Sequence, residues 1–388
     1  MAAPTAVPDE IPLDGTTLRT LHPNQLPSLI FGAGALNSSY NSESYLETDG
    51  PLRTVALALR YGIRAFDTSV YYGPSEIILG NALKALKHEF PRSSYQIMTK
   101  CGRFGPEDFD YSPARVRQSV MNSLERLHTT YLDTVYLHDV EFVADQVIPR
   151  ATGNHLVALT DEKEKAAYGL AEGQESTVHG EGDQKVLDAF AELCKLQEEG
   201  IIKKIGITGY PLPTLLRLAL LILHTPPYKP IDVLLSYSHF SIQNSSLIQF
   251  TPSFHHRAKV PQIVAASPFS MGLLTDRGPP SWHPAPEKMI ACVGEAGRSV
   301  LGGEGGMPAL AMGWAVGKAD GLEVGPETRG VPLVAGFSTP EEVHDGMRAW
   351  REVVDGKDVE RRSRKEEAVE AIFEREGYLN WSWAQPPE

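Results

Sequence analysis

The chain has 388 residues, 42% of them hydrophobic, and a formal net charge of -13. This length suits one large domain or two ordinary ones, each with a sizeable core. A chain so acidic is a poor match for nucleic acid, because binding a phosphate backbone requires clustered cations that release counterions. Nucleic acid is therefore excluded as the expected partner.

The spacing of the cysteines and the lengths of the apolar runs indicate where in the cell the protein is expected. The three cysteines have no CxxC spacing, so neither a disulfide framework nor a zinc ribbon is indicated. The N-terminus lacks the basic start and apolar run of a secretory signal. The most apolar stretch, LLRLALLILHTPP, is interrupted by Arg217 and is shorter than the ~20 residues that span a bilayer. We expect a cytoplasmic protein without a membrane partner, and a buried helix at this stretch.

From about residue 28 onward, short apolar runs alternate with stretches of helical period. The runs predict eight strands, at 28–34, 63–69, 95–100, 134–140, 203–208, 232–238, 262–267 and 331–337. The periodic stretches predict helices at 52–62, 75–90, 114–131, 183–200, 213–223, 244–260, 307–319 and 339–354. Each predicted strand is followed by a predicted helix.

Eight successive βα units predict an α/β fold, the (β/α)8 TIM barrel, whose usual size of ~250 residues leaves room for insertions. We expect a single domain over 1–388 with its barrel core at about 28–355. Two polar or Gly- and Pro-rich segments, at about 151–182 and 276–306, are expected to be irregular loop insertions. The mixed-charge run in the C-terminal extension, 356–388, predicts an exposed helix.

Four polar residues stand where predicted strands end. Asp67 and Lys100 close the second and third strands, His138 closes the fourth, and Tyr72 follows the second. In a parallel barrel these strand ends share one rim, so the four side chains are expected to meet there. Each taken singly has an ordinary structural explanation. Together they resemble a proton-transfer group, because a buried ammonium favours a phenolate and a carboxylate keeps the ammonium charged.

The segment FDTSVYYGPSE, with Lys and His on the next two strands, resembles the Asp-Thr and Tyr-Gly motif of the aldo-keto reductases. The resemblance runs from about residue 28 to 354. It implies Tyr72 as the proton donor or acceptor, Lys100 and Asp67 as the groups that tune it, and His138 as the residue that orients the substrate oxygen. Tyr71 competes by adjacency, but Tyr72 holds the family position immediately before the glycine.

The resemblance also implies a cofactor, since no side chain here can accept a hydride. The family binds a nicotinamide dinucleotide in extended form without a Rossmann unit, and no GxGxxG follows a predicted strand. KKIGITGY and VAASPFSMGLLT resemble two of its cofactor segments. In the first, Thr208 and Gly209 stand where the family usually has Ser-Asn, and in the second Ala266 replaces an aromatic that stacks on nicotinamide. The implied contacts are Thr208, Gly209, Ser236, Ser267, Pro268, Phe269, Gly272, Leu273, Gly336, Ser338 and Glu342.

Glu342 predicts which dinucleotide is used. Members of the family that use NADP place Lys or Arg near its 2'-phosphate, whereas a carboxylate there repels a phosphate and accepts a hydrogen bond from a ribose hydroxyl. NAD is therefore preferred over NADP. The alternative is that Glu342 is simply an acidic residue in the first turn of a helix. No metal is expected, because the adjacent His255 and His256 face different ways on a helix.

Within the family, YYGPSE, LHDVEF, GITGYPL, LSYSHF and ASPFSMGLLT most resemble sugar 1-dehydrogenases. These oxidise the anomeric hydroxyl of D-arabinose, L-galactose or L-fucose to the lactone on routes to ascorbate-type compounds. A small-molecule sugar is thus the expected partner, bound by a monomer or a weak homodimer. Two alternatives stay open: an NADP-dependent aldehyde or ketone reductase, and a nucleotide-binding regulatory subunit with the same fold.

Overall fold

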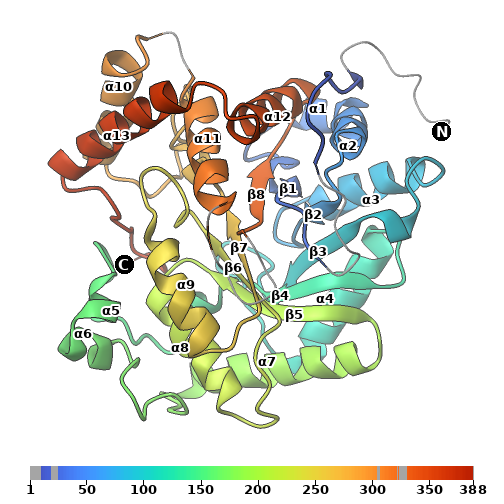
Figure 1. Cartoon of the computed structure of the whole chain (residues 1–388). Helices are drawn as coiled ribbons and strands as arrows, with labels where there is room; N and C mark the ends of the chain where they lie inside the picture. The colour runs from blue at the N-terminus through green and yellow to red at the C-terminus, as the bar shows by residue number, and fades with distance from the viewer. Residues whose placement is uncertain (1–9, 19–24, 304–305, 321, 323–329, 388) are drawn as a thin grey trace. The chain divides into compact units, whose positions relative to one another are not determined.

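A computed structural model describes residues 10–18, 25–303, 306–320, 322 and 330–387 (Figure 1). Within these residues eight strands close into a barrel in sequence order, which confirms the predicted (β/α)8 architecture. Most strand residues are buried, as expected where helices cover a parallel sheet. The strands are β1 (Leu29–Gly32), β2 (Ala65–Asp67), β3 (Gln96–Cys101), β4 (Leu132–Leu137), β5 (Ile202–Gly209), β6 (Val233–Tyr237), β7 (Gln262–Ala266) and β8 (Leu333–Gly336).

The helices follow the predicted alternation, with additional short ones. They are α1 (Glu43–Leu46), α2 (Gly50–Arg60), α3 (Ser75–Ala85), α4 (Pro113–Arg126), α5 (Val157–Thr160), α6 (Glu162–Ala167), α7 (Glu181–Glu198), α8 (Leu212–Leu223), α9 (Ser246–His256), α10 (Glu287–Ser299), α11 (Met307–Asp320), α12 (Pro340–Val354) and α13 (Val359–Arg375). Short 3₁₀ turns include η2 (Ala33–Ala35), η4 (Val140–Phe142) and η5 (Ser270–Gly272).

The chain forms two compact units. The first comprises the described residues within 1–138, 188–206 and 334–351, and the second those within 139–187, 207–333 and 352–388. In the first unit β1 to β4 pair in parallel, with Phe31 opposite Phe66 and Lys100 opposite Tyr136. Helices α3 and α4 come close together because Gly80 has no side chain, and a Cβ there would lie 2.8 Å from the Cα of Leu127.

In the second unit, β6 and β7 pair in parallel and α8 is buried from Leu212 to Ile222. This confirms the buried helix predicted from its apolar sequence. Its one charge, Arg217, is paired with Asp183 at 2.6 Å, and both side chains are buried. Among the helices that the structure describes, none is both long and apolar enough to cross a membrane.

The irregularity predicted for 276–306 is wrong in part, because this segment contains the thirteen-residue helix α10. The helix follows Pro286 and buries Met289, Cys292, Val293 and Ala296, an amphipathic spacing that the surrounding Gly and Pro residues obscured. The segment 151–182 likewise holds the short helices α5 and α6.

The exposed helix predicted in the C-terminal extension is α13, but one of its faces is covered. Val369, Ile372 and Phe373 are buried, and α13 packs against α10 and α11 (Figure 1). The polar composition of the segment hid this narrow apolar stripe, because only three of its seventeen residues are buried.

Candidate active site

The four residues predicted at the strand ends all belong to the first unit. Asp67 ends β2, Lys100 lies near the end of β3, and His138 directly follows β4. Tyr72 lies in the loop between β2 and α3. The side chains of Asp67, Lys100 and His138 are buried, whereas Tyr72 is half-buried. Three buried ionisable side chains beside one accessible phenol form an arrangement suited to proton transfer.

Asp67 and Lys100 form a buried ion pair. The Lys100 Nζ donates to Asp67 Oδ1 at 2.5 Å and to the carbonyl oxygen of Thr68 at 2.9 Å. Burial alone would lower the pKa of Lys100, but Asp67 and Tyr72 more than offset it and the pKa is raised. Burial also acts to raise the pKa of Asp67, and the ammonium opposes this effect. Lys100 is therefore held as a cation with almost no access to water.

Tyr72 and Tyr71 have different cationic neighbours. The Lys100 Nζ lies 4.7 Å from the ring centroid of Tyr72 and shares a side-chain hydrogen bond with it. The Tyr71 ring instead lies 4.0 Å from the guanidinium carbon of Arg103, which also donates to the Tyr71 hydroxyl at 3.2 Å. Gly34 makes room for the Tyr72 ring, since a Cβ there would lie 3.2 Å from it. This geometry favours Tyr72 over Tyr71 as the residue coupled to Lys100.

The His138 imidazole lies edge-on to both tyrosine rings, with its centroid 5.6 Å from that of Tyr72 and 5.7 Å from that of Tyr71. Burial, together with the charges of Lys100 and Arg103, holds the pKa of His138 well below its usual value. His138 is thus a neutral imidazole at physiological pH. Its Nδ1 is 2.9 Å from the hydroxyl oxygen of Ser69.

Two of these neighbours, Ser69 and Arg103, were not identified from the sequence. Ser69 is two residues after Asp67, and Arg103 is three residues after Lys100. Proximity to predicted strand ends was the available signal, because the residues that follow barrel strands build the same rim.

The first unit also contains the last predicted cofactor segment, Gly336, Ser338 and Glu342. Ser338 N donates to Glu342 Oε2 at 2.6 Å, and Glu342 N donates to Thr339 Oγ1 at 3.3 Å. Glu342 therefore lies in the first turn of α12, as its alternative explanation states, and its carboxylate accepts from the backbone just before the helix. Its carboxylate nevertheless stays beside Ser338.

Two residues from the segment after β1 hold Ser338 in place. Asn41 Nδ2 donates to the Ser338 hydroxyl at 3.0 Å, and the Tyr45 hydroxyl donates to the Ser338 carbonyl at 2.7 Å. Neither Asn41 nor Tyr45 was predicted from the sequence. The Thr54 hydroxyl also donates to the Ser338 carbonyl, at 3.3 Å. The side chains bonded to Ser338 are therefore neutral or acidic.

The predicted contacts Thr208 and Gly209 end β5 in the second unit. Here Glu141 fills the space beside Gly209, since a Cβ on that glycine would collide with Glu141 Oε2. The other carboxylate oxygen, Oε1, accepts from Tyr210 N at 2.9 Å. Sequence reasoning missed Glu141, although its position three residues after His138 was visible. Gly209 stands in place of the family's Asn because the Glu141 carboxylate occupies the space that a side chain would need.

Ser236, near the end of β6, lies next to a second buried histidine. Its hydroxyl is 3.4 Å from His239 Nδ1, and His239 Nε2 is 3.1 Å from the hydroxyl of Ser382. Burial lowers the pKa of His239 to about 3, so this imidazole is neutral. The C-terminal tail thus belongs to this side of the second unit, and Trp383 stacks on Tyr210 with centroids 4.4 Å apart. No pattern in the amino-acid sequence indicates this docking.

The loop after β7 contains the remaining predicted contacts, Ser267, Pro268, Phe269, Gly272 and Leu273. Consecutive positive φ values occur at Ser270 (48°), Met271 (53°) and Gly272 (93°), so the backbone turns tightly here.

Two buried serine hydroxyls in the second unit have no hydrogen-bond partner among the described residues. They belong to Ser270, in the loop after β7, and to Ser238, just after β6. Unsatisfied buried hydroxyls are costly, so both suit a site that a polar ligand completes. This feature fits a dinucleotide on the segments where the sequence predicts one.

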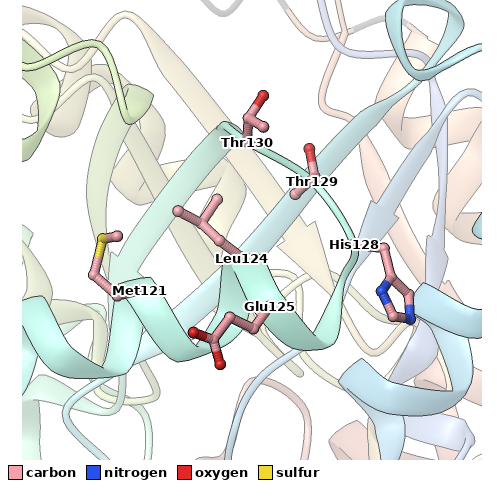
Figure 2. A pocket seen from close by; sticks show the side chains of 6 residues that line it. All are labelled: Met121, Leu124, Glu125, His128, Thr129 and Thr130. Carbon is pink, nitrogen blue, oxygen red and sulfur yellow. The ribbon is translucent and has the colours of Figure 1, made fainter.

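Within the part of the chain that the structure describes, no cluster of three or more His, Cys, Asp or Glu could hold a metal ion. Cys101, next to Lys100, is buried, and burial raises the pKa of its thiol to about 12, which makes it a poor nucleophile. An open surface pocket of about 330 Å³ lies along α4 and the turn after it (Figure 2). It contains none of the proton-transfer residues; its lining is Met121, Leu124, Glu125, His128, Thr129 and Thr130.

Comparison with known proteins gives consistent matches. The model of the aldo/keto reductase family matches residues 28–367. D-arabinose 1-dehydrogenase from Saccharomyces cerevisiae is 34% identical over 317 residues, which cover 81% of this chain and 80% of that protein. L-galactose dehydrogenase from Arabidopsis thaliana is 38% identical over 257 residues, which cover 66% of this chain and 65% of that protein.

Solved structures agree on the fold. An aldo-keto reductase from Bacillus halodurans, in its holo form, matches with a TM-score of 0.56 at 21% identity and covers 91% of this chain and 95% of its own. Glycerol dehydrogenase from Gluconobacter oxydans matches with the same TM-score of 0.56 at 19% identity, covering 94% of this chain and 96% of its own. At these identities the likeness concerns the fold alone.

Proposed function

Because the chain belongs to the aldo/keto reductase family of oxidoreductases, we propose that it oxidises the anomeric hydroxyl of an aldose to the aldonolactone with NAD. The substrate class is that of D-arabinose, L-galactose and L-fucose. Support for a sugar comes from the two relatives named as D-arabinose 1-dehydrogenase and L-galactose dehydrogenase. The observation that carries the proposal is the buried Lys100 cation, paired with Asp67 and bonded to Tyr72, with neutral His138 beside the phenol.

In this proposal Tyr72 is the general base. Oxidation at C1 removes a proton from the hydroxyl and a hydride from the carbon, leaving the carbonyl of the lactone. The Lys100 ammonium favours the phenolate form of Tyr72, which takes the hydroxyl proton. Asp67 keeps Lys100 charged, and His138 donates a hydrogen bond to the substrate oxygen. A bound nicotinamide supplies the acceptor for the hydride.

The residues proposed to hold the dinucleotide are those that the sequence predicts after β5 to β8. Thr208 and Ser236 are proposed at the nicotinamide end, and the loop from Ser267 to Leu273 at the pyrophosphate. The unpartnered hydroxyl of Ser270 supports this assignment of the loop. Gly336, Ser338 and Glu342 are proposed at the adenosine end.

Glu342 supports NAD over NADP even though it lies in the first turn of α12. Its carboxylate is fixed by Ser338 N, and the other side chains bonded to Ser338 are those of the uncharged Asn41, Tyr45 and Thr54. A 2'-phosphate placed here would be repelled by the Glu342 carboxylate, whereas a ribose hydroxyl could donate to that carboxylate.

A sugar panel tests the proposal. Purified protein is mixed with D-arabinose, L-galactose, L-fucose or D-glucose, with NAD or NADP, and reduced cofactor is followed by absorbance. We expect turnover of the first three sugars with NAD, abolished in Tyr72→Phe and retained in Tyr71→Phe. Faster turnover with NADP would overturn the role of Glu342. Undiminished turnover in Tyr72→Phe would overturn the catalytic assignment. Aldehyde reduction without sugar oxidation would favour the reductase alternative.

A further inference from the structure

Ser69 is buried in the first unit, two residues beyond the end of β2, with an exposed fraction of 0%. Its hydroxyl oxygen has two polar neighbours among the described residues: Tyr71 N, which donates to it at 3.1 Å, and His138 Nδ1 at 2.9 Å. The Tyr71 amide can only donate, so the serine oxygen already acts as an acceptor on that side.

The direction of the second hydrogen bond follows from counting hydrogens. If His138 Nδ1 carried its proton and donated to Ser69, the serine would accept twice and its own hydrogen would have no acceptor in a site closed to water. If the Ser69 hydroxyl donates to Nδ1, its own hydrogen has an acceptor and the serine oxygen still accepts from Tyr71 N. The second arrangement places the imidazole proton on Nε2.

We propose that Ser69 is a positioning residue that fixes His138 as its Nε2-protonated tautomer, so that His138 donates a hydrogen bond to the oxygen of the bound substrate. The function of that hydrogen bond rests on the sugar oxidation proposed above. The tautomer itself follows from the contacts of Ser69 alone.

The surroundings of His138 keep its imidazole neutral. Burial and the charges of Lys100 and Arg103 disfavour the doubly protonated imidazolium, so His138 can donate through only one nitrogen. Which nitrogen does so decides whether His138 stabilises the developing carbonyl oxygen or competes with Tyr72 for the hydroxyl proton. The backbone of His138 is held as well: its N donates to the Cys101 carbonyl at 2.9 Å, and its carbonyl accepts from the Tyr111 hydroxyl at 2.7 Å. The remaining freedom is therefore the ring rotation and the tautomer, and Ser69 restrains both.

Nitrogen NMR of the cofactor-free wild-type protein tests the tautomer directly. In protein labelled with ¹⁵N-histidine, with the His138 signals assigned by their loss in His138→Asn, we expect Nδ1 to resonate as an unprotonated nitrogen and Nε2 as a protonated one at pH 7. A protonated Nδ1 would overturn the proposal. This measurement needs neither sugar nor cofactor, so its failure is distinct from a failure of the proposed function.

Kinetics of variants test the positioning role. In Ser69→Ala we expect kcat to fall about tenfold with KM changed less than about twofold, as for other residues that orient a functional imidazole. Ser69→Thr keeps the hydroxyl and should restore most of kcat and the wild-type nitrogen spectrum. Ser94→Ala, on a surface turn, is the matched control and should behave as wild type.

A double variant separates positioning from folding. If Ser69 acts through His138, adding Ser69→Ala to His138→Asn should lower kcat by less than about twofold, because the group that Ser69 orients is already absent. A full tenfold further loss would show that Ser69 acts elsewhere and would refute the proposal. If Ser69→Ala does not fold, the nitrogen spectrum of the wild-type protein and the kcat of Ser69→Thr still test the proposal.

Discussion

Replacing Lys100 with Met removes one partner of a buried ion pair and leaves the other. The Asp67 side chain is 5% exposed, and its Oδ2 has no hydrogen-bond partner among the described residues. Without the ammonium, Asp67 is expected to take up a proton at pH 7. Burial already raises the pKa of Asp67 in the wild-type protein, and the variant loses the ammonium that opposes this rise. We therefore expect Lys100→Met to lower the free energy of unfolding by about 3–5 kcal/mol, the range for a buried ion pair that loses one partner.

The pH dependence of that loss identifies its cause. Folded Asp67 in the variant has a raised pKa, so the destabilisation is present at pH 7 and shrinks as the pH falls toward the unfolded pKa. Relative to wild type, Lys100→Met should regain up to about 3 kcal/mol between pH 7 and pH 5.

Urea unfolding followed by circular dichroism, at both pH values, measures the difference. The matched control is the double variant Asp67→Asn with Lys100→Met, which has no buried charge. It should lose the pH dependence and recover part of the stability, while sugar oxidation stays at least about 100-fold below wild type in both proteins. If Lys100→Met unfolds like wild type at pH 7, the pair is not buried and coupled as described, and the reasoning fails.

Gly209→Ala places a methyl group against the Glu141 carboxylate and should cost about 1–3 kcal/mol in urea unfolding, whereas Gly297→Ala, with open space around it, should cost far less. His239, with a pKa near 3 when folded and 6.5 when unfolded, costs about 2 kcal/mol as the pH falls from 7.5 to 5, so His239→Gln should flatten the stability profile by that amount. Glu342→Arg should raise the NADP/NAD ratio of kcat/KM about tenfold or more, and an unchanged ratio would place the ribose elsewhere.

The barrel and the four strand-end residues were predictable because both follow from local patterns. Alternating apolar runs and amphipathic stretches place β1 to β8 in order, and barrel geometry then gathers the residues at their carboxyl ends. The bond between Lys100 and Asp67 is one outcome of that rule. The choice between Tyr71 and Tyr72 came from the family motif, and the structure gives it a physical counterpart in their different cationic neighbours.

Contacts between segments distant in the chain, or between a glycine and a carboxylate, were not predictable in the same way. Gly209 was visible as a departure from the family pattern, but nothing in the sequence states that Glu141 fills the space. Docking of Ser382 and Trp383 against His239 and Tyr210 joins residues more than 140 positions apart. Such pairings depend on tertiary packing, and the spacing of apolar residues along the sequence does not predict them.

The two sides of the proton-transfer site have complementary roles that only the contacts reveal. In the proposed mechanism Lys100, which is paired with Asp67 and bonded to Tyr72, favours the phenolate form of Tyr72 as the proton acceptor. Burial, together with the charges of Lys100 and Arg103, keeps His138 neutral, and the proposed hydrogen bond from Ser69 directs its one ring proton to Nε2. Tyr72 then serves as the acceptor and His138 as the donor. An alcohol being oxidised needs both, since it loses its proton to a base while its oxygen becomes a carbonyl that accepts a hydrogen bond.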